Sequence, residues 1–511
     1  MPEEGGLHYR SGAGRWVIAA TVLGSGMSSV DATVVGIALP TIGREFHSSV
    51  AQLQWVVNGY TLTLAALLLV GGSLGDRLGR RRVFIIGVIW FTIASAACAL
   101  APGVTSLIFL RMLQGAGGAL LTPGSLAILQ ASFRQVDRGQ AIGAWTGLGG
   151  VAAASGPFIG GWLIAVASWR WIFFINLPLG LIVLFLSVRH IPESRDDAAP
   201  GRVDVPGALL VMTALAGITF GLIEGPALGW NHPGPVVALA VGVAAAGLFV
   251  LVESKSSAPL LPLGLFRRRQ FTVTNAVTFV VYGALGGVLF LLPVVLQVVG
   301  GYSPLASGVA LLPLTVMMLL LSSTSGRVAA RIGPRLQMSV GPVVVGFGLA
   351  LLSRVTVDST YLTGVLPAVV VFGLGLVITV APLTATALSS VPVDHAGLAS
   401  AVNNDVARVG GLIAVAVLPA LSGITGSAYL HPGQLAGGFR TATLIAGAWC
   451  VGGGVLAAVG IRNPQVRTER GSRVVDVDVD VVSEREYLHC GLDAPPAVVA
   501  EQTSPRGEPK R

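Results

Sequence analysis

Apolar runs of about twenty residues recur along the whole chain, and they constrain its fold more than any other feature. Such a run matches the ~20 residues that a helix rising about 1.5 Å per residue needs to cross ~30 Å of hydrocarbon. Only 11% of the 511 residues are charged, whereas ordinary soluble domains hold roughly 25%. One such run could be an anchor, but repeated runs predict an all-α integral membrane protein that crosses the bilayer many times.

Apolar runs bounded by charge, proline or glycine predict fourteen transmembrane helices. Their expected ranges are 16–40, 51–75, 83–101, 104–129, 140–166, 171–188, 206–224, 235–253, 271–299, 304–325, 337–353, 362–389, 401–425 and 439–461.

Basic residues are distributed unevenly between the loops that join these helices. One set of alternate loops holds sixteen arginines and lysines, whereas the other holds only Arg44, Arg170 and Arg354. Because positive charge collects on the cytoplasmic side, we expect the basic loops and both termini to face the cytosol, in a multi-pass protein of the inner (plasma) membrane. Topology thus accounts for the net charge of +8, and nucleic acid is not an expected partner.

Two of the loops carry a weak internal repeat. "GSLGDRLGRR" (72–81) and "GRVAARIGPR" (326–335) share Gly, Arg, Gly and Arg at a constant offset. In a chain of two six-helix halves the second copy would follow the eighth helix. It follows the tenth, so two extra helices are expected between the halves.

The repeat and the charges together predict the organisation of the chain. The expected parts are a cytoplasmic N-terminus (1–15), a six-helix bundle (16–188), a cytoplasmic linker (189–205), two additional helices (206–253), a second linker (254–270), a second six-helix bundle (271–461) and a polar cytoplasmic tail (462–511).

Residue types that carry enzymatic chemistry are sparse. Cys98, Cys450 and Cys490 are too few and too scattered for disulfides or a metal site, and the first two are interpreted as packing residues. The seven histidines form no H-E-x-x-H pattern, and no G-x-x-x-x-G-K-[ST] motif occurs. We therefore expect neither an enzyme nor a cofactor, and transport by this chain would draw on an ion gradient.

Several motifs resemble the major facilitator superfamily, and within it the fourteen-helix drug:proton antiporters. "GSLGDRLGRR" is similar to the signature between helices two and three, and "LRMLQGAGGALLTP" (110–123) and "SGPFIGGWL" (155–163) are similar to the motifs of helices four and five. "VDATVVGIALP" (30–40) and "WRWIFFINLPLG" (169–180) resemble the fourteen-helix branch in particular.

The resemblance covers nearly all of residues 15 to 461. It implies the fold of two six-helix bundles plus two extra helices, and export in exchange for protons. One departure is Ala152, where the helix-five motif usually has a further glycine.

The loop after the second helix is a candidate gate formed by Asp76, Arg77, Gly79 and Arg80. A tight turn needs Gly79, and Asp76 can accept bonds from Arg80 and lie against the positive end of a neighbouring helix. The cluster can then latch the two halves together on the cytosolic side. The alternative is that these arginines only follow the charge-topology rule.

The helix-five motif is a candidate hinge. Pro157 removes a backbone hydrogen bond and permits a bend, while Gly156, Gly160 and Gly161 allow another helix to approach closely. A packing seam without a hinge would use the same small residues.

Asp31 lies within the first apolar run, where a charge costs at least ~2.5 kcal/mol even on the mildest insertion scale. We expect it to face the central cavity as the proton site, or to pair with a cationic substrate. Arg111 is expected to point toward the first helix and to relay that proton, with Gln114 on the same helix face. Purely structural hydrogen bonding is the alternative for each of them.

Gln114 and three further, charged residues are candidates for the substrate cavity. Glu224 ends the seventh helix, where a position at the outer rim is expected. Asp405 and Arg408 stand at i and i+3 and are expected to form a local pair.

The leading hypothesis is therefore a monomeric secondary transporter that exports a drug-like small molecule in exchange for protons, without metal or cofactor. Proton-coupled uptake of a small organic nutrient is the alternative. A membrane enzyme or receptor is disfavoured by the scattered histidines and by the absence of a segment long enough for a sensor domain.

Overall fold

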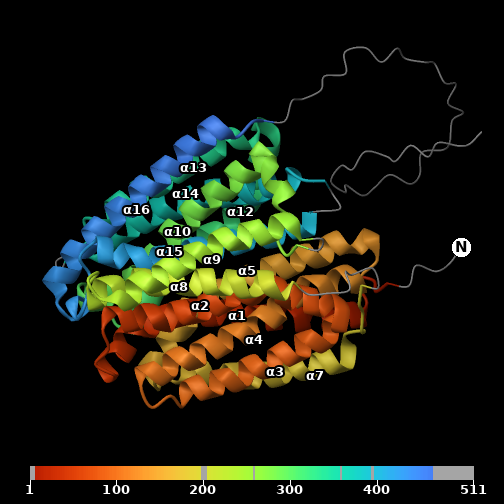
Figure 1. The fold of residues 1–511 in the computed structure, drawn as a ribbon, viewed down its shortest axis with the longest axis horizontal. Coiled ribbons are helices and arrows are strands. Elements are labelled where there is room, and N and C mark those ends of the chain that lie inside the picture. Colours follow the sequence, from red (N-terminus) through yellow and green to blue (C-terminus); the bar gives the residue numbers. More distant parts are fainter. Residues whose placement is uncertain (1–5, 197–203, 257–258, 357–358, 393–395, 464–511) are drawn as a thin grey trace, which may run out of the picture. The chain divides into compact units, whose positions relative to one another are not determined.

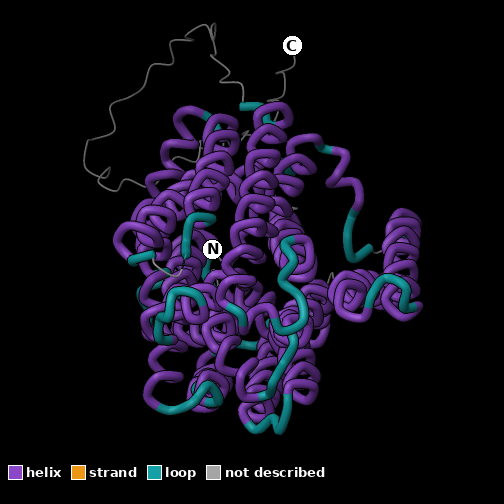
Figure 2. Tube along the Cα trace, turned by 90° about the vertical axis from the view of Figure 1, so that its left-hand side faces the viewer, coloured by secondary structure: helices purple, strands orange, loops and turns teal. Residues whose placement is uncertain are grey.

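The protein is helical in its computed structural model, which describes residues 6–196, 204–256, 259–356, 359–392 and 396–463. Figure 1 and Figure 2 show long helices joined by short loops, with no β-strand among the described residues. Within these described residues, fourteen helical segments are long and apolar enough to cross a membrane, which confirms the predicted number and order.

Most of these spans are single helices. They are α1 (Gly12–Glu45), α2 (Val50–Leu78), α3 (Arg80–Ala99), α4 (Val104–Ser132), α5 (Gln135–Val166), α8 (Val205–Leu228), α9 (Pro233–Lys255), α10 (Arg269–Val298), α13 (Pro334–Leu352), α15 (Ala396–Leu421) and α16 (Pro432–Gly460). Three spans combine two helices, namely α6 (Trp171–Phe174) with α7 (Asn176–His190), α11 (Pro304–Ala310) with α12 (Leu312–Ile332), and η2 (Tyr361–Val365) with α14 (Leu366–Ser389). Short 3-10 turns lie at η1 (Leu263–Arg267) and η4 (Ala428–Leu430).

Helix α1 runs further than expected. The predicted range ends at Pro40, but the helix continues to Glu45 with the proline inside it. The helix therefore extends beyond the apolar run by five residues, which include Arg44 and Glu45. Helix α2 then begins with a capping box, in which Gln52 N–H donates to Ser49 Oγ (3.2 Å) and Ser49 N–H donates to Gln52 Oε1 (2.9 Å).

The two copies of the internal repeat form the same kind of turn. Gly79 (φ 108°) lies between α2 and α3, and Gly333 (φ 84°) lies between α12 and α13. Residues with a side chain rarely adopt such φ values, so glycine is needed at both turns. The repeat is therefore a repeat of backbone geometry as well as of sequence.

Each repeated turn is also anchored in the same way. The backbone N–H of Arg81 donates to Glu193 Oε1 (3.1 Å), and the N–H of Arg335 donates to Asn463 Oδ1 (3.0 Å). The guanidinium of Arg81 donates to the carbonyl of Ile191, and that of Arg335 donates to the carbonyl of Ala458. In both copies the turn is thus tied to the chain near the end of a later helix, α7 or α16.

Helices α8 and α9 pair with each other, and α8 also contacts α2 and α15. In Figure 1 the pair is drawn in yellow-green, between α1–α4 in red and orange and α10–α16 in green and blue. The two extra helices therefore lie where the earlier and later helices meet.

The helices are held together at the end where α1 leads into α2. Gln54 on α2 donates to the carbonyl of Val415 on α15 (2.6 Å), and Asn58 donates to that of Leu412 (3.1 Å). Pro419 has no N–H, so the Val415 carbonyl lacks its helical donor, and Gln54 replaces it. Tyr429 closes the same end by donating to the carbonyl of Ser48 (2.8 Å).

The half of α5 that precedes Ala152 has few neighbours. A Cβ added at Gly143, Gly147 or Gly150 would meet nothing within 4 Å. Most residues of α5 before Ala152 are exposed or half-buried. The described helices are therefore joined at the α1–α2 end, which we call the closed end, whereas the half of α5 before Ala152 has few neighbours.

Candidate functional site

Asp31 and Arg111 form an ion pair in the interior of the first group of helices. Arg111 Nη1 on α4 donates to Asp31 Oδ2 on α1. Asp31 is 0% exposed and Arg111 is 1% exposed. Neither side chain faces lipid, and the predicted orientation of Arg111 toward the first helix agrees with this geometry.

Neutral polar groups complete the hydrogen bonding of this pair. Gln114 Nε2 donates to Asp31 Oδ1 (2.8 Å), and Gln114 Oε1 accepts from Arg111 (2.7 Å). Asn176 on α7 reaches the same Asp31 oxygen (3.4 Å) and also donates to Ser95 on α3 (3.0 Å). We call these five residues, Asp31, Ser95, Arg111, Gln114 and Asn176, the Asp31 network.

Aromatic rings enclose the guanidinium of Arg111. Its Cζ lies 4.3 Å from the centre of the Tyr60 ring and 5.8 Å from that of Phe173. Arg111 Nε donates to the carbonyl of Val56 (3.2 Å). The cation is thus stabilised by π faces and a carbonyl as well as by Asp31.

The candidate hinge packs α5 against α1. A Cβ at Gly156 would clash with Thr33, and one at Gly160 would clash with Val34. Pro157 leaves the carbonyl of Ala153 without its helical donor, and Thr33 Oγ1 lies 3.2 Å from that oxygen and can donate to it. The motif therefore forms a close seam with α1, two residues along from Asp31.

The same motif continues to a third helix. A Cβ at Gly161 would lie 2.6 Å from the carbonyl oxygen of Pro304 and 2.7 Å from Leu305 Cα. A Cβ at Gly308 would clash with the carbonyl of Pro157. Helix α5 therefore touches α11 backbone to backbone at the closed end of the molecule. Whether Pro157 also acts as a hinge stays a prediction.

The candidate gate forms an ion pair within its own turn. Arg80 donates to Asp76 Oδ1 through Nη2 (2.8 Å) and Nε (2.9 Å), and the carbonyl of Asp76 accepts from the N–H of Asp196 (2.8 Å). Gly79 forms the turn as expected, and Arg77 lies two residues before it, in the last turn of α2. The contacts of Asp76 join it to residues that precede α8, so the predicted latch between the two halves stays a prediction.

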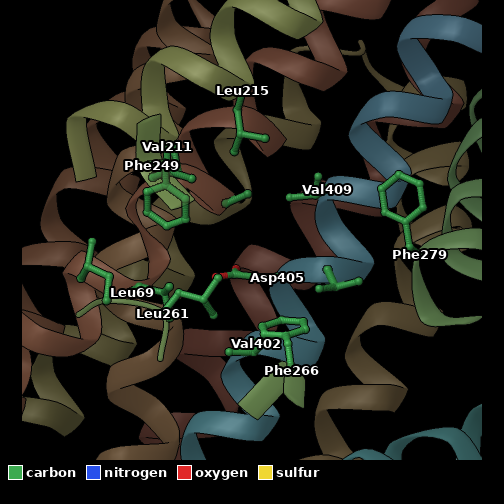
Figure 3. A pocket seen from close by; sticks show the side chains of 14 residues that line it. Leu69, Val211, Leu215, Phe249, Leu261, Phe266, Phe279, Val402, Asp405 and Val409 are labelled. Atoms are coloured by element: carbon green, nitrogen blue, oxygen red, sulfur yellow. The ribbon is translucent and has the colours of Figure 1, made fainter. Parts of the chain in front are cut away.

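Asp405 lines a pocket that the structure places apart from the Asp31 network (Figure 3). The cavity volume is about 190 Å³, and its walls come from α2, α8, α9, α10, α15 and the segment 260–266. Asp405 Oδ1 is buried and has no hydrogen-bond partner in the described part of the chain.

The expected pair between Asp405 and Arg408 is wrong. The two side chains form no ion pair within 4 Å among the residues that the structure describes. Side chains three positions apart on a helix lie near each other, but they need not point toward one another. Asp405 extends into the pocket instead.

The other two cavity candidates lie elsewhere. Glu224 accepts a hydrogen bond from the indole N–H of Trp55 (2.8 Å), near the start of α2 and thus toward the closed end. Gln114 belongs to the Asp31 network and does not line the pocket. Cys98 and Cys450 are fully buried, as expected of packing residues, while Cys490 lies outside the described residues.

Sequence reasoning missed three residues of this site. Asn176 and Ser95 were not singled out, although each is a polar residue inside an apolar run, which is the signal that identified Asp31. Thr33 was missed because a threonine in a membrane helix usually bonds to its own backbone, as Thr33 also does. No group of three or more metal-binding side chains occurs within the described residues.

Fourteen spans, a duplicated turn and an ion pair buried among helices define a multi-pass membrane protein. The sequence model of the Major Facilitator Superfamily matches residues 21–415. The chain therefore belongs to the major facilitator superfamily, and within it to the fourteen-helix drug:proton antiporters.

Two similar curated proteins and one solved structure agree with this assignment. The tetracenomycin C resistance and export protein of Streptomyces glaucescens is 37% identical over 79% of this chain and 75% of its own length. Multidrug resistance protein Stp of Mycobacterium tuberculosis is 36% identical over 81% of this chain and 77% of its own. A bacterial homologue of the human lysosomal transporter Spinster, solved in an inward-facing, unoccupied conformation, has a TM-score of 0.64 at 16% identity, covering 88% of this chain and 97% of its own. The protein is thus a multi-pass inner-membrane transporter.

Proposed function

We propose that this protein exports drug-like small molecules across the inner membrane in exchange for protons. The observation that carries the proposal is the buried ion pair of Asp31 and Arg111, which connects through Thr33 to the α5 seam. The names of the relatives support export, since one is a resistance and export protein and another is a multidrug resistance protein.

Proton binding at Asp31 would release Arg111. A protonated carboxyl no longer attracts the guanidinium as an ion, and Arg111 keeps Gln114, Tyr60 and the Val56 carbonyl as partners. Protonation of Asp31 would shift the balance between the two conformations, so that one proton site serves both directions of the cycle.

The seam offers a route from Asp31 to the closed end. A shift of α1 at Asp31 moves Thr33 and Val34, which are in contact with Gly156 and Gly160. Helix α5 in turn touches α11 near Gly161. Release of that contact would open the closed end as the bundles 16–188 and 271–461 rock against each other, which is the movement of alternating access.

The charges orient the cycle in the membrane. The arginine-rich loops would face the cytosol, together with both termini, so that the closed end faces outward and the described conformation is open to the cytosol. This is the state that would take up a compound for export.

The proposal is tested by a drug-susceptibility panel in a host that lacks its own efflux pumps. We expect the native protein to raise resistance to at least one compound and Asp31→Asn to lose this resistance at equal expression. Everted vesicles with a proton gradient imposed in each direction then separate the two coupling modes. Substrate uptake into vesicles that are acidic inside supports antiport, whereas uptake only with acid outside would show symport and overturn the proposal.

A further inference from the structure

Two carboxyl groups meet where the start of α8 lies beside the end of α9. Asp204 is the N-cap of α8, and its Oδ1 accepts from the N–H of Gly207 (2.8 Å). Glu253 lies two residues before the end of α9 and is only 3% exposed. Its carboxyl is in hydrogen-bond contact with that of Asp204. We call Asp204 and Glu253 the carboxyl pair.

The facing oxygens of the carboxyl pair have no other partner. Asp204 Oδ2 and Glu253 Oε1 are buried, and neither accepts a hydrogen bond from the described residues. They lie 2.8 and 2.5 Å from the point where a Cβ at Gly207 would stand. Glycine at this position therefore leaves the space in which the two oxygens meet.

No arginine or lysine of the described residues forms an ion pair with the carboxyl pair. The other charged side chains on α8, on α9 and on the elements that pack against them are Glu224, Lys255, Asp76 and Arg77 of α2, Asp405 and Arg408 of α15, and Arg267 of η1. Two carboxylates in contact repel each other, whereas a single proton between them forms a strong O–H···O⁻ bond. The geometry therefore suits a pair that holds one proton.

The same glutamate also binds the chain beyond α9. Glu253 Oε2 accepts from the N–H of Leu261 (2.9 Å). Leu261 belongs to the segment 259–262, which leads through η1 to α10, the first helix of the second bundle. The position of the Glu253 side chain thus fixes how the extra helices connect to that bundle.

We infer that Asp204 and Glu253 bind one proton between them, as a second proton site separate from Asp31, and that this proton holds the segment 259–262 against the extra helices. When the proton leaves for water, the two carboxylates repel each other. The Glu253 side chain then withdraws, and the N–H of Leu261 loses its acceptor. The carboxyl pair responds to the pH on the side of the arginine-rich loops, and the inference requires no assumption about the exported compound.

Infrared difference spectra of the purified full-length protein in lipid nanodiscs test for the proton. A protonated carboxyl has a C=O stretching band that a carboxylate lacks. We expect the native protein to lose such a band as the pH is raised. Glu253→Gln and Asp204→Asn should each lack this band, because the one proton belongs to both groups. Glu224→Gln makes the same chemical change elsewhere on α8 and should keep the band.

Hydrogen exchange at the Leu261 amide tests what the proton holds in place. Above the pH at which the band disappears, the native protein should exchange this amide about tenfold faster than Asp204→Asn. Asparagine still caps α8 and donates an amide hydrogen to Glu253 at every pH. Below that pH the two proteins should exchange alike.

Gly207→Ala keeps both carboxyls but places a Cβ in the space between their oxygens. It should therefore exchange the Leu261 amide rapidly at both pH values. This variant separates contact between the carboxyls from their mere presence.

A native protein whose infrared spectrum matches that of Glu253→Gln at every pH would overturn the inference. So would equal exchange at Leu261 in the native protein and Asp204→Asn above the transition. Slow exchange that requires Mg²⁺ or Ca²⁺ instead of protons would also overturn it, because a metal cation would then hold the two carboxylates. None of these results depends on transport, which the susceptibility panel tests, so the two proposals fail separately.

Discussion

The two intramembrane aspartates of this protein occupy opposite kinds of surroundings. Asp31 is surrounded by donors from Arg111, Gln114 and Asn176, and both of its oxygens are bonded. Asp405 lies in an apolar pocket, and its Oδ1 has no partner among the described residues. A carboxylate whose partners are built into the protein suits proton exchange, because protonation changes the protein itself.

The comparison predicts that removing Arg111 and removing the carboxylate of Asp405 change the free energy of unfolding in opposite directions. Arg111→Ala should destabilise the protein by about 3–5 kcal/mol, because it leaves Asp31 as an uncompensated buried charge. Thermal unfolding of the purified variants in detergent measures this. The double variant Asp31→Asn with Arg111→Gln should recover much of the loss without recovering proton-coupled transport. A single Arg111→Ala variant as stable as the native protein would show that the pair is exposed to water in solution.

The surroundings of both aspartates are known in one conformation, in which α5 contacts α11. A variant that weakens this contact extends the comparison to a second conformation. Gly308→Ala places a Cβ against the carbonyl of Pro157 and should destabilise the closed end by about 2 kcal/mol. Distances between spin labels placed across α5 and α11 should then report a larger open population. Gly150→Ala, where a Cβ meets nothing within 4 Å, is the matched control and should leave the distances unchanged.

Removing the carboxylate of Asp405 should raise the free energy of unfolding, whereas removing Arg111 should lower it. Asp405→Leu is expected to stabilise the protein by about 1 kcal/mol, because it replaces a carboxylate whose Oδ1 is buried without a partner among the described residues by an apolar group. The midpoint of thermal unfolding should rise. A fall of the midpoint would mean that Asp405 has a structural partner.

The smallest expected effect concerns the link between the Asp31 network and α5. Thr33→Val keeps the shape of the side chain but leaves the Ala153 carbonyl without the donor that replaces the missing N–H of Pro157. A loss of about 1 kcal/mol in stability is expected. Transport should slow more than stability falls, and Thr33→Ser should restore the rate. Unchanged transport by Thr33→Val would show that the seam between α1 and α5 takes no part in coupling.

Much of the fold could be predicted from the sequence because bilayer physics acts on each segment separately. Every helix must satisfy its own backbone, so apolar length alone predicted the fourteen spans. The repeated Gly79 and Gly333 turns were predictable for the same local reason. Asp31, Arg111 and Gln114 were identified because a polar residue within an apolar run is itself the signal.

Contacts between helices could not be predicted in this way. Asn176 joins Asp31 across 145 positions of sequence, and Thr33 reaches the Ala153 carbonyl across 120. Their pairing depends on how α7 and α5 pack against α1, which no local pattern encodes. The expected Asp405–Arg408 pair failed because helical spacing constrains which residues are neighbours, while the pocket decides where the side chain points.

Proton coupling at Asp31 is the central claim, and reconstituted vesicles test it most directly. Purified native protein and Asp31→Asn would each be given a substrate found in the panel, and two rates would be measured, transport driven by a pH gradient and exchange of labelled for unlabelled substrate without a gradient. The account predicts that Asp31→Asn loses the gradient-driven rate and keeps the exchange. Gradient-driven transport by Asp31→Asn at the native rate would contradict it.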